Sequence, residues 1–183
     1  MARYVAFLRG INLGKRRVKM DALRRHFTDL GLQNAQTFIA SGNVIFDDAA
    51  TDPAVLESSI ERHLESVLGY DVQTFVRPLS RLESLSRLDR VAAAIDEGFT
   101  PHVIFLRSPA TETVEASLRD LQTPDDKFHT DGTEVFWFRR GGLSDSSIEA
   151  RHLERALDKG QNSSRNLDTV RRILEKFQDA PSA

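Results

Sequence analysis

The segment near the N-terminus that reads RYVAFL constrains the fold most, because the strand that it predicts is apolar on both faces. Val5 and Phe7 fall on one face, and the apolar residues between and beside them fall on the other. A strand with one solvated face alternates between polar and apolar residues, whereas a strand without this alternation is buried on both sides. The chain must therefore supply cover for two faces of the sheet that contains residues 3–8.

Periodicity along residues 9–78 predicts the elements that follow this strand. A helix comes first, with apolar residues at helical spacing over 20–30. Two short strands flank the turn at 41–43, and a second helix follows at 53–68. A strand that ends at Pro78 completes the order β-α-β-β-α-β, which is the ferredoxin-like pattern.

The same order of elements restarts at His102. The predicted elements are a strand, a helix, a pair of strands joined by a turn, and two helices, and they lie at residues 102–106, 111–121, 127–138, 147–157 and 167–178. A capping box formed by Ser80 and Glu83 begins a further helix between the two series. The restart indicates two related halves, and the relation lies in the order of the elements.

The predicted fold class is α+β, with two ferredoxin-like halves packed together. The first half covers residues 1–78, a helical connector covers 79–100, and the second half covers 101–183. The second half is predicted to lack the last strand and to end in a helix, because no strand pattern precedes the final helical one.

The charge of the chain is distributed unevenly. The 183 residues have a net charge of -2, but residues 1–27 hold eight Lys or Arg and one acid, a net of +7. Residues 28–78 hold two Lys or Arg and eight acids, a net of -6. A local basic patch on a nearly neutral protein indicates that the partner is a discrete anion. A nucleic-acid partner is not favoured.

The absence of cysteine excludes disulfides, thiol nucleophiles and cysteine-bound metals. The first apolar run becomes charged at Arg9 and is too short for a signal peptide or a membrane span. We therefore expect a soluble cytoplasmic protein without a membrane partner.

The loop at residues 9–19 has the composition of an anion-binding loop. It differs from a P-loop, because three residues separate Gly10 from Gly14 and Arg16 stands where a hydroxyl would hold magnesium. Its glycines still allow backbone N–H groups to approach an anion, and Arg9 and Lys15 add charge. The alternative is a plain strand-to-helix connection with solvated cations, and the residues favour neither interpretation.

Two further motifs are candidates for the same ligand. The turn Ser41-Gly42-Asn43 is expected near the opening loop, since ferredoxin-like order makes the first and third strands neighbours. A turn whose Ser and Asn satisfy the backbone is the favoured alternative there, and Ser41 has no base to activate it as a nucleophile. In SSRNLDTV, Asn166 is expected to cap the last helix, and Arg165 is expected to meet a carboxylate or an anion. An N-cap beside an exposed arginine is the alternative interpretation.

The histidines and acids predict no metal site. The five histidines are His26, His63, His102, His129 and His152, and none has metal-ligand spacing to another or to an acid. No pair of acids is placed for acid–base catalysis, so no catalytic residue is assigned and no cofactor is expected.

Four segments of the chain resemble a bacterial family catalogued as domain of unknown function 1697. They are RYVAFLRGINLGKRRVKMDALR, TFIASGNVIF, EVFWF and SSRNLDTV. The resemblance implies an α/β protein with a duplicated ferredoxin-like arrangement, and it implies no established activity. The residues that match the family motifs are Arg9, Gly10, Asn12, Gly14, Ser41, Gly42, Asn43, Arg165 and Asn166. Ser163 and Leu167 depart from the family pattern, which has Thr and Trp at these positions.

The function predicted from these observations is the binding of a small anion, such as phosphate, a nucleotide or a carboxylate. The predicted ligand-binding residues are Arg9, Asn12, Lys15, Ser41, Asn43, Arg165 and Asn166. An RNA-binding module is an alternative, but it needs exposed aromatic residues on the third strand, where only Phe46 is available. Trp137 is expected to lie in the core. A hydrolase or transferase that uses Ser41 or Arg165, a structural adaptor, and a homo-oligomer remain open.

Overall fold

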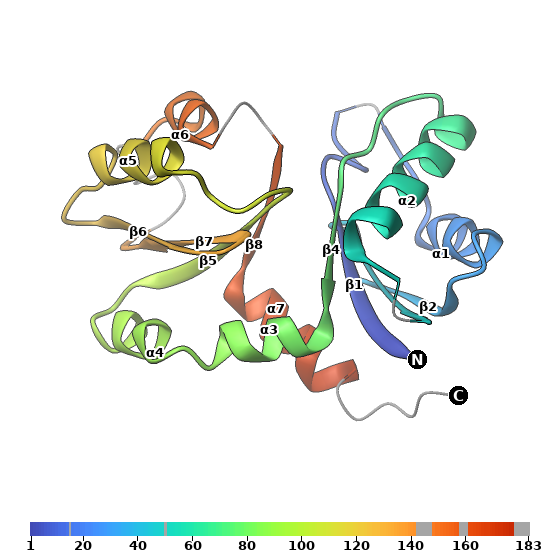
Figure 1. Ribbon diagram of the computed structural model, residues 1–183, viewed down its shortest axis with the longest axis horizontal. Helices are drawn as coiled ribbons and strands as arrows, with labels where there is room; N and C mark the ends of the chain where they lie inside the picture. Colours follow the sequence, from blue (N-terminus) through green and yellow to red (C-terminus); the bar gives the residue numbers. More distant parts are fainter. Residues whose placement is uncertain (15, 50, 142–147, 158–160, 178–183) are drawn as a thin grey trace. The chain divides into compact units, whose positions relative to one another are not determined.

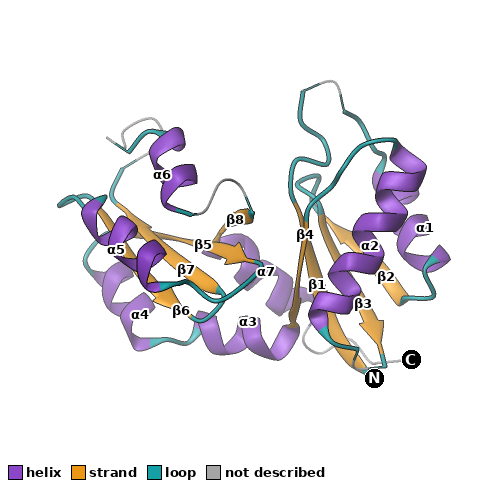
Figure 2. Cartoon of the chain, turned by 45° about the horizontal axis from the view of Figure 1, so that its top comes forward, coloured by secondary structure: helices purple, strands orange, loops and turns teal. Residues whose placement is uncertain are grey.

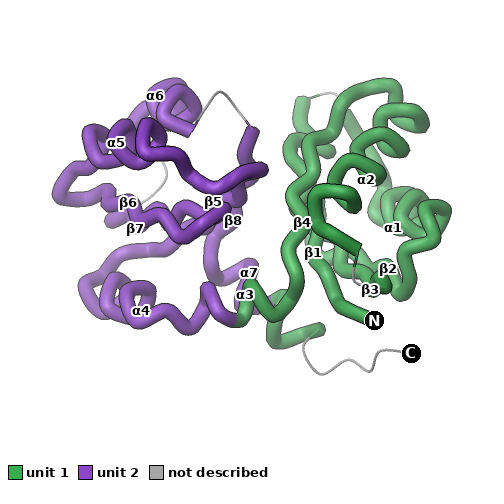
Figure 3. The backbone as a smooth tube through the Cα atoms, in the orientation of Figure 1, with its two compact units in different colours: residues 1–83, 173–183 green, residues 84–172 purple. Residues whose placement is uncertain are grey.

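The computed structural model describes all residues except 15, 50, 142–147, 158–160 and 178–183 (Figure 1). The described strands form two four-stranded antiparallel sheets with helices packed on them (Figure 2). The chain divides into two compact units (Figure 3), which are considered separately below. Unit 1 comprises residues 1–83 and 173–183, and unit 2 comprises residues 84–172.

Unit 1 contains one sheet with two helices on one of its faces (Figure 2). Its elements are β1 (Ala2–Leu8), α1 (Met20–Asp29), β2 (Gln33–Phe38), β3 (Asn43–Asp48), α2 (Pro53–Leu68) and β4 (Thr74–Pro78). The strand order is β2-β3-β1-β4, and β1 runs antiparallel to both of its neighbours. The unit therefore has the predicted order of elements, with the first strand at the centre of the sheet.

Strand β1 is buried on both faces, as its sequence predicts. On the helix-covered face, Ala6 and Leu8 belong to one apolar cluster with Phe27 of α1 and Ile60 of α2. On the other face, Val5 and Phe7 are fully buried as well, and residues from the C-terminal end of unit 1 pack on this sheet. Removal of this apolar surface from water stabilises the fold by about 1.5–3 kcal/mol for each fully buried large side chain.

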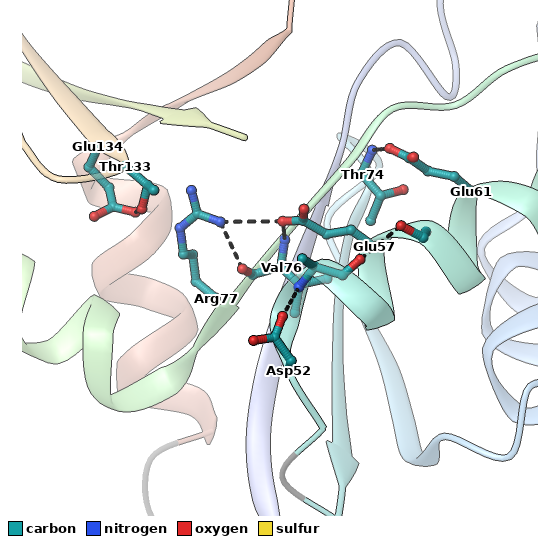
Figure 4. Close-up of polar contacts among 10 residues, drawn as sticks. Asp52, Glu57, Glu61, Thr74, Val76, Arg77, Thr133 and Glu134 are labelled. Atoms are coloured by element: carbon teal, nitrogen blue, oxygen red, sulfur yellow. Dashed lines mark hydrogen bonds and ion pairs between the residues drawn. The ribbon is translucent and has the colours of Figure 1, made fainter. Parts of the chain in front are cut away.

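The edge strand β4 is protected by two glutamates of α2 (Figure 4). Glu57 Oε1 accepts a hydrogen bond of 2.8 Å from the backbone N–H of Val76, and Glu61 Oε1 accepts one of 2.8 Å from the N–H of Thr74. Glu57 also lies 3.4 Å from Arg77 Nη1, and both of these side chains are buried. The two carboxylates are four residues apart on the helix, and this spacing places them beside alternate N–H groups of the strand. Without these acceptors, the N–H groups would be open to pairing with another chain.

Unit 2 repeats the arrangement of unit 1. Its elements are α4 (Asp89–Asp96), β5 (Thr100–Leu106), α5 (Glu112–Asp120), β6 (Asp126–Asp131), β7 (Glu134–Arg139), α6 (Ala150–Ala156) and β8 (Asn162–Asn166). The strand order is β6-β7-β5-β8, with β5 at the centre. The helices α5 and α6 lie on one face of this sheet (Figures 1 and 2). Trp137 is buried in the core, as predicted, and its Nε1 donates to Asp126 Oδ1 over 2.8 Å.

The prediction that the second half lacks its last strand is wrong. Residues 162–166 form β8, which pairs antiparallel with β5, so that His102 lies opposite Asn166 and Leu106 lies opposite Asn162. The segment reads NSSRN and has no apolar alternation. It is a strand because it completes the hydrogen bonding of β5, whose sequence requires a partner on each side.

The connector and the C-terminus differ in detail from the predicted halves. The connector holds two helices, α3 (Leu79–Ser86) and α4, and the boundary between the units falls within α3. The last helix, α7 (Leu167–Phe177), is divided between the units at residue 173. Helix α6 begins at Ala150, and the predicted start at Ser147 lies outside the described residues. Among the described helices, none is both long and apolar enough to span a membrane.

A buried ion pair joins β1 to β3 in unit 1. Arg3 Nε lies 2.7 Å from Asp47 Oδ1 and Arg3 Nη2 lies 3.0 Å from Asp47 Oδ2, while Asn34 Nδ2 donates to the same carboxylate over 2.9 Å. The side chain of Asp47 is only 1% exposed. The bonds from Arg3 lower the pKa of Asp47; burial opposes them, and Asn34 adds to the lowering.

Replacing Asp47 by Asn should lower the free energy of unfolding at neutral pH by about 2–4 kcal/mol, because the partly buried guanidinium of Arg3 loses its charged partner. The folded-state pKa of Asp47 is depressed, so its stabilising effect is present above the ordinary Asp value of about 3.9 and is lost as the pH falls through the folded-state value. Urea unfolding should show a constant difference in the free energy of unfolding between the wild type and Asp47→Asn near neutral pH. This difference should shrink in acid. The control Asp21→Asn, on an exposed residue, should change stability by less than about 0.5 kcal/mol.

The edge-protecting glutamate gives a second stability prediction. Glu57→Ala should destabilise the protein by about 2–4 kcal/mol, because the N–H of Val76 and the guanidinium of Arg77 lose a buried acceptor. Glu65→Ala, on an exposed position of the same helix, should stay within about 0.5 kcal/mol of the wild type. Equal effects of the two substitutions in chemical denaturation would contradict a specific role for Glu57.

Candidate functional site

The predicted ligand-binding residues fall into separate groups. Arg9, Asn12, Ser41 and Asn43 belong to unit 1, whereas Arg165 and Asn166 lie on β8 in unit 2. Lys15 lies outside the described residues. Unit 1 thus holds one group and unit 2 holds the other.

The structure brings the opening loop and the 41–43 turn together at one end of the unit 1 sheet. Strands β1 and β3 pair antiparallel with Phe7 opposite Asn43, and the N–H of Leu8 donates to Gly42 O over 2.8 Å. Gly42 has a φ of +76°, and a Cβ at this position would lie 2.8 Å from Ile11 Cγ2 and 3.2 Å from Leu8 O. Only glycine fits this contact. The turn also holds Ile39 at a φ of +50°, which β-branched residues rarely adopt.

The asparagines of these two motifs bind the main chain. Asn12 Oδ1 accepts a bond of 2.7 Å from the N–H of Val18, which closes the opening loop. Asn43 is fully buried, and its Nδ2 donates to Phe38 O over 3.0 Å and to Ser41 Oγ over 2.9 Å. These contacts support the alternative in which the turn residues satisfy the backbone. Asn12 thus helps to hold the opening loop, and Asn43 helps to hold the 41–43 turn.

The exposed cations of the opening loop are partly held by local contacts. The guanidinium of Arg16 lies 4.2 Å from the ring centroid of Tyr70, a cation–π distance. Arg17 Nη1 donates to the carbonyl groups of Asn12, Gly14 and Arg16. The described part of the loop thus carries a concentrated positive charge on its surface.

In unit 2, Asn166 has its predicted role at the start of α7. Its Oδ1 accepts a bond of 2.8 Å from the N–H of Asp168. Arg165 Nη1 donates to Ser163 Oγ and to Ser164 O, each at a distance of 2.8 Å. Burial lowers the pKa of Arg165 to about 10, so its guanidinium remains charged at neutral pH.

Unit 2 also contains a cavity that the sequence did not reveal. Its volume is about 340 Å³, and it lies between the loop after β5, the first turns of α5 and the end of α6. Its polar lining includes Arg107, Ser108, Thr111, Thr113, Ser117 and Arg155. None of the described residues that line it is acidic. Two arginines and several hydroxyl-bearing residues therefore line the same cavity.

The available sequence signal for this cavity is a short internal repeat. Residues 5–9 read VAFLR and residues 103–107 read VIFLR, so Arg9 and Arg107 each follow the central strand of their unit. The backbone hydrogen bonds show the same equivalence. The N–H of Leu8 donates to Gly42 O and the N–H of Leu106 donates to Thr133 O, each at a distance of 2.8 Å. Comparison of the residues, and not only of the element order, would have identified Arg107.

A second cluster missed by sequence spacing lies on the helices of unit 1. His26 and Asp29 of α1 and His63 of α2 each place a ligand atom within 4.8 Å of the other two. Burial lowers the pKa of His26, the nearby His63 lowers it further, and Asp29 acts in the opposite direction. The net lowering favours the uncharged form of the His26 imidazole. The two histidines come from different helices, so no local spacing connects them.

These features define a mixed α/β protein with two four-stranded antiparallel sheets and with candidate ligand sites on the loops and helices. The chain belongs to the family described as a protein of unknown function, DUF1697, whose model matches residues 1–136. The solved structure of a conserved bacterial protein from Streptococcus pneumoniae is similar to it, with a TM-score of 0.79 and 26% sequence identity. That similarity covers 98% of this chain and 99% of the other. No curated protein matches the sequence.

The contact at Gly42 gives a prediction with a matched control. Gly42→Ala should destabilise the protein by about 2–4 kcal/mol for two reasons. An alanine is strained at this positive φ, and its methyl group would clash with atoms of Leu8 and Ile11. Gly31→Ala has a comparable φ of +82° but nothing within 4 Å of the added atom, so it should cost about 1–2 kcal/mol. Equal losses in urea unfolding would show that the close contact contributes nothing.

Proposed function

We propose that the protein binds a small anionic ligand, such as a phosphate monoester or a carboxylate, in the cavity of unit 2. The observation that carries this proposal is the placement of Arg107 and Arg155 on a cavity of about 340 Å³. We propose further that the two units are ferredoxin-like and that the protein is located in the cytoplasm of a bacterium.

The chemistry of the lining favours an anion. A guanidinium group offers several N–H donors in a planar fork that matches the oxygens of carboxylates and phosphates. The hydroxyl groups of Thr111 and Ser117, among others, supply neutral donors that fit the same oxygens. A volume of this size is at the lower end of the range for ligand pockets, which supports a small molecule over a polymer.

The opening loop of unit 1 is the second candidate position. Arg9 follows β1 as Arg107 follows β5, and the loop adds the positive charges of Lys15, Arg16 and Lys19. Asn12 and the 41–43 turn give this loop its shape, as described above. We propose that this surface attracts the same class of ligand, with Arg9 and Lys15 as the contacting cations. On β8, we propose that Arg165 contacts an anion and that Asn166 positions it.

Burial of the aromatic residues weighs against the RNA-binding alternative. Phe46 of β3 is fully buried, where it packs against Tyr4 and Phe27. On β7, the aromatic residues Phe136 and Trp137 are buried in the same way. A platform that stacks bases needs these rings on an open sheet surface.

Isothermal titration with inorganic phosphate, nucleoside monophosphates and small carboxylates would test the proposal. Arg155→Gln should weaken the best ligand by about tenfold or more, because a charge-assisted contact contributes about 1.5–3 kcal/mol. Arg107→Gln should act in the same direction. The control Arg151→Gln, on an exposed residue of α6 paired with Glu149, should leave binding unchanged.

The unit 1 position is distinguished by Arg9→Gln in the same titration. If affinity falls in this variant and not in Arg107→Gln or Arg155→Gln, the ligand belongs to the opening loop. If none of the three variants alters the affinity of any ligand in the panel, the proposal is wrong.

A further inference from the structure

The cluster of His26, Asp29 and His63 has the composition and the geometry of a metal site. His26 and Asp29 are three residues apart in the last turn of α1 and therefore lie on the same side of that helix. His63 comes from α2, which lies beside α1 on the same face of the unit 1 sheet (Figure 2). The ring centroids of the two histidines are 5.5 Å apart at an interplanar angle of 61°.

One buried nitrogen on each of the two half-buried histidines points to a missing partner. His26 Nδ1 and His63 Nε2 are buried atoms, and neither has a hydrogen-bond partner within the described part of the chain. A buried polar atom without a partner costs about 1–3 kcal/mol, so such atoms are rare in native proteins. Two of them in adjacent side chains, with a carboxylate next to them, are explained together by one bound cation.

We propose that His26, Asp29 and His63 bind a divalent transition-metal ion of the zinc type. Two imidazole nitrogens and one carboxylate are a donor set that proteins use for zinc, with a fourth position open to water or to a ligand. Calcium and magnesium prefer oxygen donors throughout, so they are not the expected ions. Position also favours a cation, because His26 and Asp29 lie at the C-terminal end of α1, where the helix dipole is negative.

The three side chains need only a small adjustment to reach bonding distance. Ligand atoms around a tetrahedral zinc ion lie about 3.3 Å apart, since each bond is about 2.0–2.1 Å long. The present separations are at most 4.8 Å. Asp29 is exposed, so its carboxylate can rotate toward the two imidazoles. The site belongs to the helices of unit 1 and does not depend on the proposed anion function.

Metal binding by the full chain tests this proposal. After treatment with a chelator and its removal, the wild-type protein should bind one Zn²⁺, and Co²⁺ should give the visible absorption of a tetrahedral site. Zinc at about 100 times its Kd should raise the Tm by about 5 °C or more. His26→Gln, His63→Gln and Asp29→Asn should each weaken zinc binding by about tenfold or more, because each removes one ligand. His152→Gln, on α6 of unit 2, should bind zinc as the wild type does.

The metal-free stability of the variants separates a ligand role from a structural role. Each variant should keep the Tm of the metal-free wild-type protein and lose only the increase that zinc produces. Asp29→Asn keeps the test decisive if a histidine variant does not fold, because Asp29 is exposed. The proposal is overturned if the wild type shows no zinc-dependent rise in Tm, or if the folded variants retain it.

Discussion

The central strand of each unit is buried on both faces and paired on both edges, and the rest of the structure depends on this constraint. In unit 1, Val5 and Phe7 are buried on one face of β1 while Ala6 and Leu8 are buried on the other. Antiparallel neighbours on both sides satisfy the backbone of the strand. The same pairing directs the chain after β1 and the turn before β3 to one end of the sheet. The pairing of β1 with β3 thus determines where the opening loop and the 41–43 turn meet.

The edges of the two sheets show how the remaining backbone groups are satisfied. At β4, side chains of α2 accept hydrogen bonds from alternate N–H groups of the strand. At the corresponding edge of unit 2, β8 is short and polar, and its Asn162 and Ser163 are buried although its sequence is hydrophilic. Short edge strands with polar residues resist pairing with other chains. This property also conceals them from a search for apolar alternation.

The polar residues of the motifs have two different roles. Asn12 and Asn43 bind main-chain groups, and Gly42 allows two segments of backbone to approach each other, so these residues build the end of the sheet. Arg9 follows the central strand of unit 1 and Arg107 follows that of unit 2, so each lies at the end of its own sheet. This division makes Arg107 and Arg155 stronger candidates than the asparagines for contact with an anion.

The sequence by itself determined the order of the elements in unit 1, the burial of β1, the helix cap at Asn166 and the core position of Trp137, because periodicity and capping are local properties of the chain. It did not determine β8, whose residues are strand-forming only because β5 needs a partner. Nor did it bring His26 to His63 or Arg107 to Arg155, since these pairs are far apart in the chain and meet only when the helices pack on their sheets. Tertiary structure decided these contacts because sheet pairing and helix packing join residues that no local spacing relates.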